Sequence, residues 1–319
     1  MNRPLTMSLA VLVLLLAGCQ AVRPAPVPRP TSTADAAASA THRTMVGGRI
    51  RTYQVYRPEL PAGARVPLVV MLHGALGTGA QARTSYGWDE QAVRDGFVVA
   101  YPDGLNRSWA VSDTCCGPSA ASRVDEMSFI RQMITEISRS TPIDSSRIFA
   151  TGISNGGMLA YRLACGTDLF AAIGPVSATM LGTCEKPFPT SVIHIHGGAD
   201  ATIPLRGGPG KRSNNGTGRY PADTSGPPIA GLAETWRQVD RCPQPMITTS
   251  GVVTRSVAAC PDGRGVTLIT ITDAGHQWPG QPGPTGAAVA ALNLDRPSAA
   301  LDATATIWNF FAEHPRKTG

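Results

Sequence analysis

Short apolar runs alternate with amphipathic stretches along this chain of 319 residues, and no other feature constrains its fold as strongly. A strand covered by helices on both faces is an almost continuous apolar run, and a crossover helix leads from it to the next parallel strand. Such runs predict buried strands at 68–72, 97–101, 147–151, 171–176, 192–196 and 266–271. The pattern predicts an α/β fold: a single domain with a mostly parallel central sheet and helices on both faces.

The segments between these runs supply the expected helices. Residues 125–139 place five apolar side chains on one helical face, with Asp125 and Glu126 at the end where the helix dipole favours negative charge. Further helices are expected over 88–96, 158–165, 230–239 and 300–312. Residues 47–56 predict a strand at a sheet edge, and the Gly/Ala-rich stretch after His73-Gly74 predicts a loop.

A short glycine-flanked serine motif lies between one predicted strand and one predicted helix. Residues Gly152-Ile153-Ser154-Asn155-Gly156 match G-x-S-x-G, in which the glycines permit a strained turn and close packing of helix on strand. A chain with 34 glycines can match so short a pattern by chance, but the strand–helix context makes chance a poor explanation. We predict that Ser154 is a catalytic nucleophile.

A serine hydroxyl needs a base to take its proton and a third group to hold that base. Asp200 follows the predicted strand 192–196, and His276 follows the predicted strand 266–271. Taken alone, the first could be a turn residue and the second a packed loop residue. Together they lie at strand ends in the order Ser, Asp, His that is typical of α/β-hydrolases, so we predict a catalytic triad.

Acyl transfer also needs hydrogen-bond donors for the developing oxyanion. We expect the backbone N–H groups of Asn155 and Ala75 to supply them, and a structural role for His73. His194 and His196 alternate on a strand; a metal pair is one interpretation, and burial beside the acid loop is the simpler one.

Two tryptophans, Trp109 and Trp278, are candidate substrate-binding walls of the cleft, and a place in the core is the alternative for each.

The N-terminus predicts an export signal. Arg3 precedes a run of about 13 mostly apolar residues, which is too short to cross a bilayer core of about 30 Å. Leu16-Ala17-Gly18-Cys19 resembles the lipobox of bacterial lipoproteins, so we expect residues 1–18 to be a signal peptide and Cys19 to be lipidated. An ordinary secretory signal is the alternative. Residues 19–42, rich in Pro, Ala, Ser and Thr, predict a tether, which leaves 43–319 as the folded domain.

Six cysteines remain after Cys19, and an even number in an exported chain predicts disulfides. They are Cys115, Cys116, Cys165, Cys184, Cys242 and Cys260. Six cysteines allow 15 pairings. We expect Cys242 to pair with Cys260 because both flank an apparent hairpin, and the other four to pair among themselves. A metal site is disfavoured because the chain has no C-x-x-C.

The ordered motifs VVMLHG, SDTCCGP, GISNGGMLAYRLAC, DLFAAIGPVSA, HIHGGAD and GHQWPG resemble one esterase family. This family joins polyhydroxybutyrate depolymerases, feruloyl and acetyl-xylan esterases and related bacterial lipoproteins, and the resemblance covers about residues 47–312. It implies an α/β-hydrolase fold with Ser154 as nucleophile, Asp200 as acid and His276 as base. Residues 125–129 read DEMSF where many relatives read DDVGF, which leaves the start of that helix open.

These observations predict an exported serine esterase that hydrolyses small acyl or aromatic esters of the feruloyl or acetyl type, free or linked to a saccharide. It would form an acyl-enzyme on Ser154 and need no cofactor or metal. Alternatives are a short-chain polyhydroxyalkanoate depolymerase, a peptidase on the same fold and a non-catalytic surface-binding lipoprotein. A net charge of +6 spread over a chain with 16% charged residues gives little reason to expect nucleic acid as a partner. We expect a monomer that meets the membrane only through its lipid, on the cell surface or in the periplasm.

Overall fold

The computed structural model describes residues 41–281, 295 and 297–317. The signal peptide, Cys19 and the tether up to residue 40 lie outside the described residues. The first strand, β1, begins at Thr41, two residues before the expected start of the domain.

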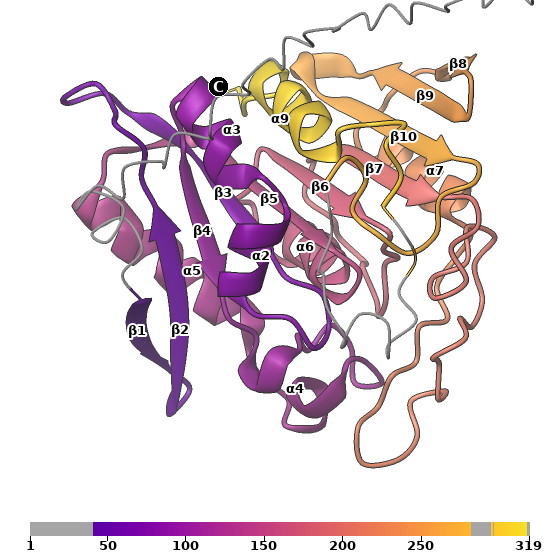
Figure 1. Cartoon of the computed structure of the whole chain (residues 1–319), viewed down its shortest axis with the longest axis horizontal. Helices are drawn as coiled ribbons and strands as arrows, with labels where there is room; N and C mark the ends of the chain where they lie inside the picture. Colours follow the sequence, from indigo (N-terminus) through magenta and orange to yellow (C-terminus); the bar gives the residue numbers. More distant parts are fainter. Residues whose placement is uncertain (1–40, 282–294, 296, 318–319) are drawn as a thin grey trace, which may run out of the picture.

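One ten-stranded sheet forms the centre of the molecule (Figure 1). Its strands are β1 (Thr41–Val46), β2 (Arg49–Tyr56), β3 (Val66–Leu72), β4 (Val98–Pro102), β5 (Ile143–Ile153), β6 (Ala172–Val176), β7 (Ser191–Gly197), β8 (Met246–Ser250), β9 (Val253–Ala259) and β10 (Gly265–Ile271). They lie in the order β1-β2-β4-β3-β5-β6-β7-β10-β9-β8. The central strands, from β4 to β10 in this order, run parallel, and antiparallel pairs extend both edges. The predicted α/β class with a mostly parallel sheet is confirmed.

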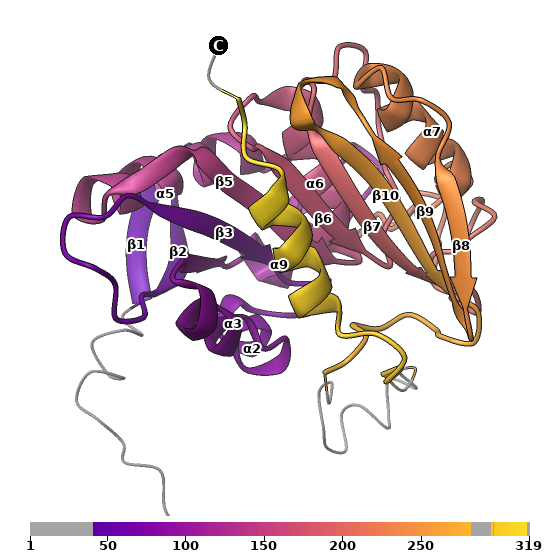
Figure 2. The same ribbon diagram turned by 90° about the horizontal axis from the view of Figure 1, so that it is seen from above.

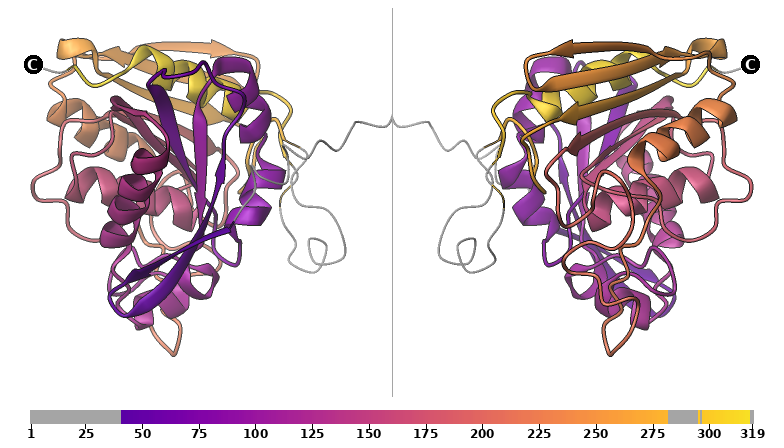
Figure 3. Two further views of the ribbon diagram at one scale, coloured as in Figure 1. Left: turned by 90° about the vertical axis from the view of Figure 1, so that its left-hand side faces the viewer. Right: turned by 90° about the vertical axis from the view of Figure 1, so that its right-hand side faces the viewer.

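Helices cover both faces of this sheet, as Figure 2 shows from above. The helices are α2 (Gly79–Ser85), α3 (Trp88–Asp95), α4 (Gly117–Ala121), α5 (Glu126–Ser140), α6 (Asn155–Gly166), α7 (Ile229–Val239) and α9 (Ala303–Glu313), with short 3₁₀ turns at Leu105–Arg107 and Pro261–Gly263. Side chains of α5, α6 and α7 pack in one core, and side chains of α2, α3 and α9 pack in the other. The side views of Figure 3 show the sheet between these layers.

Strand β3 shows why a continuous apolar run predicts such a strand. All seven of its residues are buried. Because successive side chains point to opposite faces, Leu68 and Val70 enter the core beneath α5 and α6, whereas Val69 and Met71 enter the core beneath α3 and α9. Because both faces of this strand are buried, polar and apolar residues do not alternate along it.

Some short elements differ from the expectation. Helix α2 forms in the Gly/Ala-rich stretch where a loop was expected; the Thr78 hydroxyl accepts the N–H of Gln81, and Ala82 is buried. Strand β1 and helix α4 were not foreseen either. The start of α5 is well defined despite the altered motif, because Asp125 caps it by accepting the N–H of Ser128 at 3.0 Å.

Three disulfides join the six cysteines that remain after Cys19. Cys242 pairs with Cys260 across the β8–β9 hairpin, as expected. The other four pair among themselves, Cys165 with Cys184 and Cys115 with its neighbour Cys116. Among the described residues, no helix is long and apolar enough to cross a membrane.

Candidate active site

Ser154 occupies the sharp turn between β5 and α6. Its backbone has φ 56° and ψ −123°, a conformation that costs free energy for a residue with a side chain and that clusters at functional sites. The flanking glycines allow the turn to pack, since a Cβ on Gly156 would lie 2.2 Å from the Leu72 carbonyl oxygen and one on Gly152 would lie 2.6 Å from it. The spacing of G-x-S-x-G thus places the serine at the carboxyl end of the sheet.

Asp200 and His276 meet next to this turn. Asp200 follows β7 and His276 follows β10, and these strands are parallel neighbours, so their carboxyl ends coincide. His276 Nδ1 lies 2.8 Å from Asp200 Oδ2. The other carboxylate oxygen, Oδ1, accepts the N–H groups of Thr202 and Ile203 at 2.9 and 2.8 Å. Burial alone would raise the pKa of Asp200, but the hydrogen bond and charge of His276 and the Ile203 N–H hold it below its ordinary value.

A cavity of about 490 Å³ lies at the predicted triad. Ser154 and His276 both line it, and Asp200 lies buried behind His276. Within the described residues the Ser154 hydroxyl makes no hydrogen bond, and such contacts often tighten only when a substrate is bound. One part of the wall is apolar and includes Leu76, Tyr86, Met158, Ile203 and Trp278. Polar side chains at the cavity include Gln81, Thr202, Arg212, Thr224 and Asp295.

The two predicted oxyanion donors, Ala75 and Asn155, also line this cavity. The N–H of Asn155 is the first of helix α6 and therefore has no partner within the helix. In the part of the chain that the structure describes, the N–H of Ala75 has no hydrogen-bond acceptor either. Both residues line the same cavity as Ser154, so their N–H groups stay the predicted donors to an oxyanion.

The structure corrects the expectation for Trp109. Its side chain is fully buried and is not part of the cavity lining, so it does not form a wall of the cleft. Its backbone instead holds the Asn155 side chain: the Trp109 N–H donates to Asn155 Oδ1 at 2.7 Å, and Asn155 Nδ2 donates to the Trp109 carbonyl at 3.0 Å. Its indole N–H donates to the His73 carbonyl at 2.8 Å. Trp109 therefore connects the loop that carries Ala75 to the first residue of α6.

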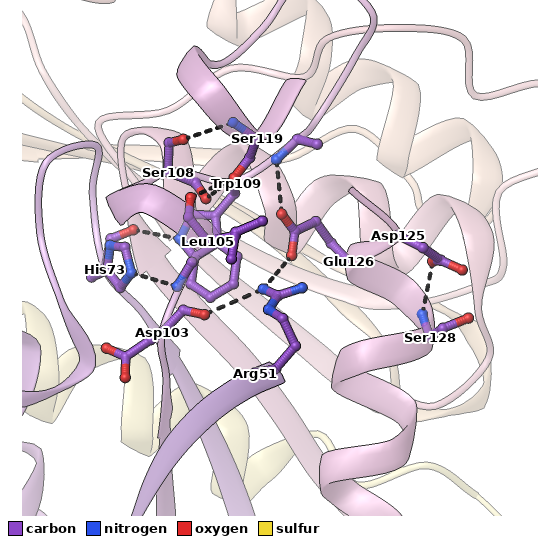
Figure 4. A network of polar contacts seen from close by, with 12 residues as sticks. Arg51, His73, Asp103, Leu105, Ser108, Trp109, Ser119, Asp125, Glu126 and Ser128 are labelled. Carbon is purple, nitrogen blue, oxygen red and sulfur yellow. Dashed lines mark hydrogen bonds and ion pairs between the residues drawn. The ribbon is translucent and has the colours of Figure 1, made fainter. Parts of the chain in front are cut away.

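A buried polar network stands behind Trp109 (Figure 4). Glu126 accepts the N–H of Ala110 at 3.1 Å and forms an ion pair with Arg51 at 2.7 Å. Arg51 also donates to the Asp103 carbonyl. His73 joins the same network, because its Nε2 accepts the Gly104 N–H at 2.9 Å while its Nδ1 donates to the Gly74 carbonyl. The structural role expected for His73 is thus confirmed.

Trp278, the second candidate wall, does line the cavity. Only 2% of its surface is exposed, and its indole N–H donates to the Thr304 hydroxyl at 3.0 Å. Its ring packs against Tyr86 with centroids 4.8 Å apart. Tyr86 was not predicted as a lining residue, and no signal in the sequence marks it, because α2 brings it there from a stretch expected to be a loop.

His194 and His196 lie fully inside the protein, beside the acid loop as expected. Their rings hydrogen-bond to each other, with His194 Nε2 2.9 Å from His196 Nδ1. Within the described ranges, no three side chains of His, Cys, Asp or Glu are grouped so that they could hold a metal ion.

Comparisons with known proteins identify the family of this chain. Residues 51–201 match the model of the family described as esterase PHB depolymerase, and this range contains Ser154 and Asp200. The chain is 30% identical over 272 residues to a protein named "Putative esterase NocK" from Nocardia uniformis subsp. tsuyamanensis, covering 76% of this chain and 75% of that one. The chain belongs to this esterase family.

A more distant relative and one solved structure are also similar to the chain. It is 25% identical to feruloyl esterase B of Piromyces equi, covering 66% of this chain but only 39% of the relative. An acetyl xylan esterase from Aspergillus awamori has the same fold, with a TM-score of 0.56 and 15% identity over 86% of this chain and 99% of that one. The fold of this family member is therefore that of the α/β-hydrolases.

Proposed function

We propose that this protein is a serine esterase that forms an acyl-enzyme on Ser154. The observation that carries the proposal is the Asp200–His276 contact of 2.8 Å beside a strained serine in one cavity. A structural turn or a binding surface has no physical need for this combination. The order of the three residues in the chain and their family motifs support the same assignment.

In this mechanism the Asp200 carboxylate accepts the Nδ1–H of His276 and so leaves Nε2 free to take the proton of Ser154. The serine oxygen attacks the ester carbonyl, and the N–H groups of Ala75 and Asn155 stabilise the oxyanion. His276 then gives its proton to the leaving alcohol. A water molecule, deprotonated by His276, attacks the acyl-enzyme, and the collapse of the second oxyanion releases the acid and restores Ser154.

The cavity favours a small acyl or aromatic ester. Its volume of about 490 Å³ and its wall of Tyr86, Trp278 and Leu76 suit a flat apolar group, while polar side chains at the cavity such as Thr224 can contact the remainder, for example a saccharide. Relatives named feruloyl esterase and a structural neighbour named acetyl xylan esterase support this substrate class. Because the family description also names PHB depolymerase, a short-chain polyhydroxyalkanoate is the second candidate substrate.

We further propose an exported, lipid-anchored protein with a signal peptide at 1–18, a lipidated Cys19, a tether and a monomeric catalytic domain. Three disulfides fit an oxidising compartment. Metabolic labelling of the full chain with a fatty acid, compared with Cys19→Ala, tests the anchor: label that persists in the variant contradicts it.

The test of the esterase is hydrolysis of p-nitrophenyl acetate, methyl ferulate and a polyhydroxybutyrate suspension by the full chain and by Ser154→Ala. We expect turnover of a small ester that falls by as much as about 10⁶-fold in the variant, as for other triad nucleophiles. Clearing of the polymer suspension would select the second candidate. No turnover, together with no labelling of Ser154 by a fluorophosphonate probe, would leave a non-catalytic binding protein.

A further inference from the structure

A line of buried side chains runs from the nucleophile helix to the acid loop. Tyr161 on α6 places its hydroxyl 2.7 Å from His194 Nδ1 on β7. His194 Nε2 lies 2.9 Å from His196 Nδ1, and His196 Nε2 lies 2.8 Å from the carbonyl oxygen of Ile203. Each of these three residues is only 1% exposed to solvent.

The hydrogen bonds of this line have only one consistent direction when the imidazoles are neutral. The Ile203 carbonyl can only accept, so His196 Nε2 carries the proton and its Nδ1 accepts. His194 must then donate through Nε2, and its Nδ1 accepts the hydroxyl proton of Tyr161. Burial lowers the pKa of both histidines, which keeps them neutral. Every polar atom of the three side chains is thereby paired.

The line ends on the residue that fixes the carboxylate. Ile203 accepts from His196 through its carbonyl, and its own N–H donates to Asp200 Oδ1 at 2.8 Å. His196 Nε2 also lies 3.6 Å from Asp200 Oδ2, the oxygen that contacts His276. A shift of His196 would therefore move the backbone of Ile203 and both oxygens of Asp200.

Apolar side chains could fill this space without the cost of burying polar groups. A line of polar side chains in which every hydrogen bond is made instead fixes the relative positions of the segments that it joins. We infer that Tyr161, His194 and His196 are positioning residues that tie the acid loop to the nucleophile helix and aim Asp200 at His276. They contact no substrate and act through Ile203. This inference rests on the proposed esterase function.

The test compares four variants of the full chain. His196→Leu removes the donor to Ile203, and His196→Gln retains an amide that can reach the same carbonyl. Tyr161→Phe removes only the hydroxyl at the far end of the line. Tyr53→Phe is the matched control, because it removes the hydroxyl of another buried tyrosine. Tyr53 lies on β2, does not line the cavity, and donates to Glu136 on α5 at 2.8 Å.

Two readouts separate positioning from a general loss of stability. The first is kcat and KM on p-nitrophenyl acetate. The second is the far-downfield proton resonance of the His276–Asp200 hydrogen bond, assigned by its absence in Asp200→Asn. We expect His196→Leu to lower kcat by about 10²-fold, the typical effect of a displacement near 1 Å, with KM unchanged and the resonance lost or shifted. His196→Gln should retain more activity, and Tyr161→Phe should lower kcat by about 10-fold.

Wild-type kcat and an unshifted resonance in folded His196→Leu would overturn the inference. If that variant does not fold, Tyr161→Phe decides in the same way, and equal effects of Tyr161→Phe and Tyr53→Phe would also overturn it. A wild-type protein without ester turnover would refute the proposed function instead, and the resonance would still report whether His196 positions Asp200.

Discussion

The two sides of the cavity are held in place by different means. On the side of the oxyanion donors, one buried residue, Trp109, bonds directly to the loop after β3 and to the first residue of α6. On the side of the acid and base, the carboxylate of Asp200 depends on its loop and on a line of three buried side chains. The groups that Trp109 contacts directly, the Asn155 amide and the His73 carbonyl, do not titrate, whereas two of the three side chains behind Asp200 are histidines.

The supports also differ in charge. The network behind Trp109 contains a buried ion pair, Arg51 with Glu126, whose side chains are 1% and 2% exposed. The imidazoles behind Asp200 are neutral. Burial lowers the pKa of one histidine on the donor side, His73, and of two on the acid side, His194 and His196. We therefore expect the donor side to be the more sensitive to loss of a single charge and the acid side to be the more sensitive to pH.

The largest effect is expected on the donor side. Glu126→Ala leaves Arg51 buried without its partner, and breaking a buried pair in this way costs about 3–5 kcal/mol. Urea denaturation of the variant and the wild type measures this loss in the free energy of unfolding. Glu234→Ala is the control, because that residue pairs with Arg237 at the surface of α7 and should change stability little. If Glu126→Ala lowers the free energy of unfolding no more than Glu234→Ala does, the two sides do not differ in their sensitivity to loss of a charge.

A disulfide tests whether stability and alignment can be separated on the acid side. Cys242–Cys260 closes the hairpin next to β10, which leads to His276. Replacing both cysteines by serine should lower the free energy of unfolding by about 3 kcal/mol through the loss of loop closure, with kcat unchanged in the folded protein.

Cys165–Cys184 is the matched comparison, since the two disulfides span 19 and 18 residues. A change of kcat in the Cys242/Cys260 variant that exceeds the change in the Cys165/Cys184 variant would show that the hairpin also positions His276.

Trp109 and Trp278 are both buried tryptophans, but only Trp278 lines the cavity. Trp109→Phe keeps an aromatic ring but removes the bond to the His73 carbonyl, so it should misplace the loop of Ala75 and lower kcat by about 10²-fold at most. Trp278→Phe changes a cavity wall and should act mainly on KM. Steady-state kinetics on methyl ferulate separates the two. A raised KM with normal kcat in Trp109→Phe would return Trp109 to the substrate-binding wall.

The smallest effect is the change in the pH dependence of stability when one buried histidine is replaced. The pKa values of His194 and His196 are lowered by burial, so the folded protein excludes protons that the unfolded chain binds below about pH 6.5. The stability contributed by the neutral rings is present above that pH and is lost as the pH falls, by up to about 1.4 kcal/mol per pH unit for each histidine. Unfolding midpoints from pH 8 to pH 5 should decline less steeply in His194→Gln than in the wild type or Tyr53→Phe. Equal slopes would show that the line does not confer pH sensitivity.

Several elements could be predicted because their signals are local. The apolar runs of β3, β5 and β7, the spacing of G-x-S-x-G and the positions of Asp200 and His276 at strand ends are properties of short segments. Helix α2 was missed because its composition resembles a loop and it is stabilised by burial of Ala82 rather than by helix propensity. Trp109 was misplaced because a buried tryptophan and a tryptophan in a cleft have the same sequence signal.

By itself, the sequence determined the α/β class, the serine turn, the order of the predicted triad and the pairing of Cys242 with Cys260. Only the tertiary structure decided that Trp109 hydrogen-bonds to Asn155, 46 positions further along the chain. The same holds for the hydrogen bonds that link His196 to Asp200 through Ile203. Periodicity and turn chemistry act between near neighbours and can be inferred from the order of residues. The partner of a buried polar atom depends instead on which strands and helices pack side by side, and that is fixed only when the whole sheet has formed.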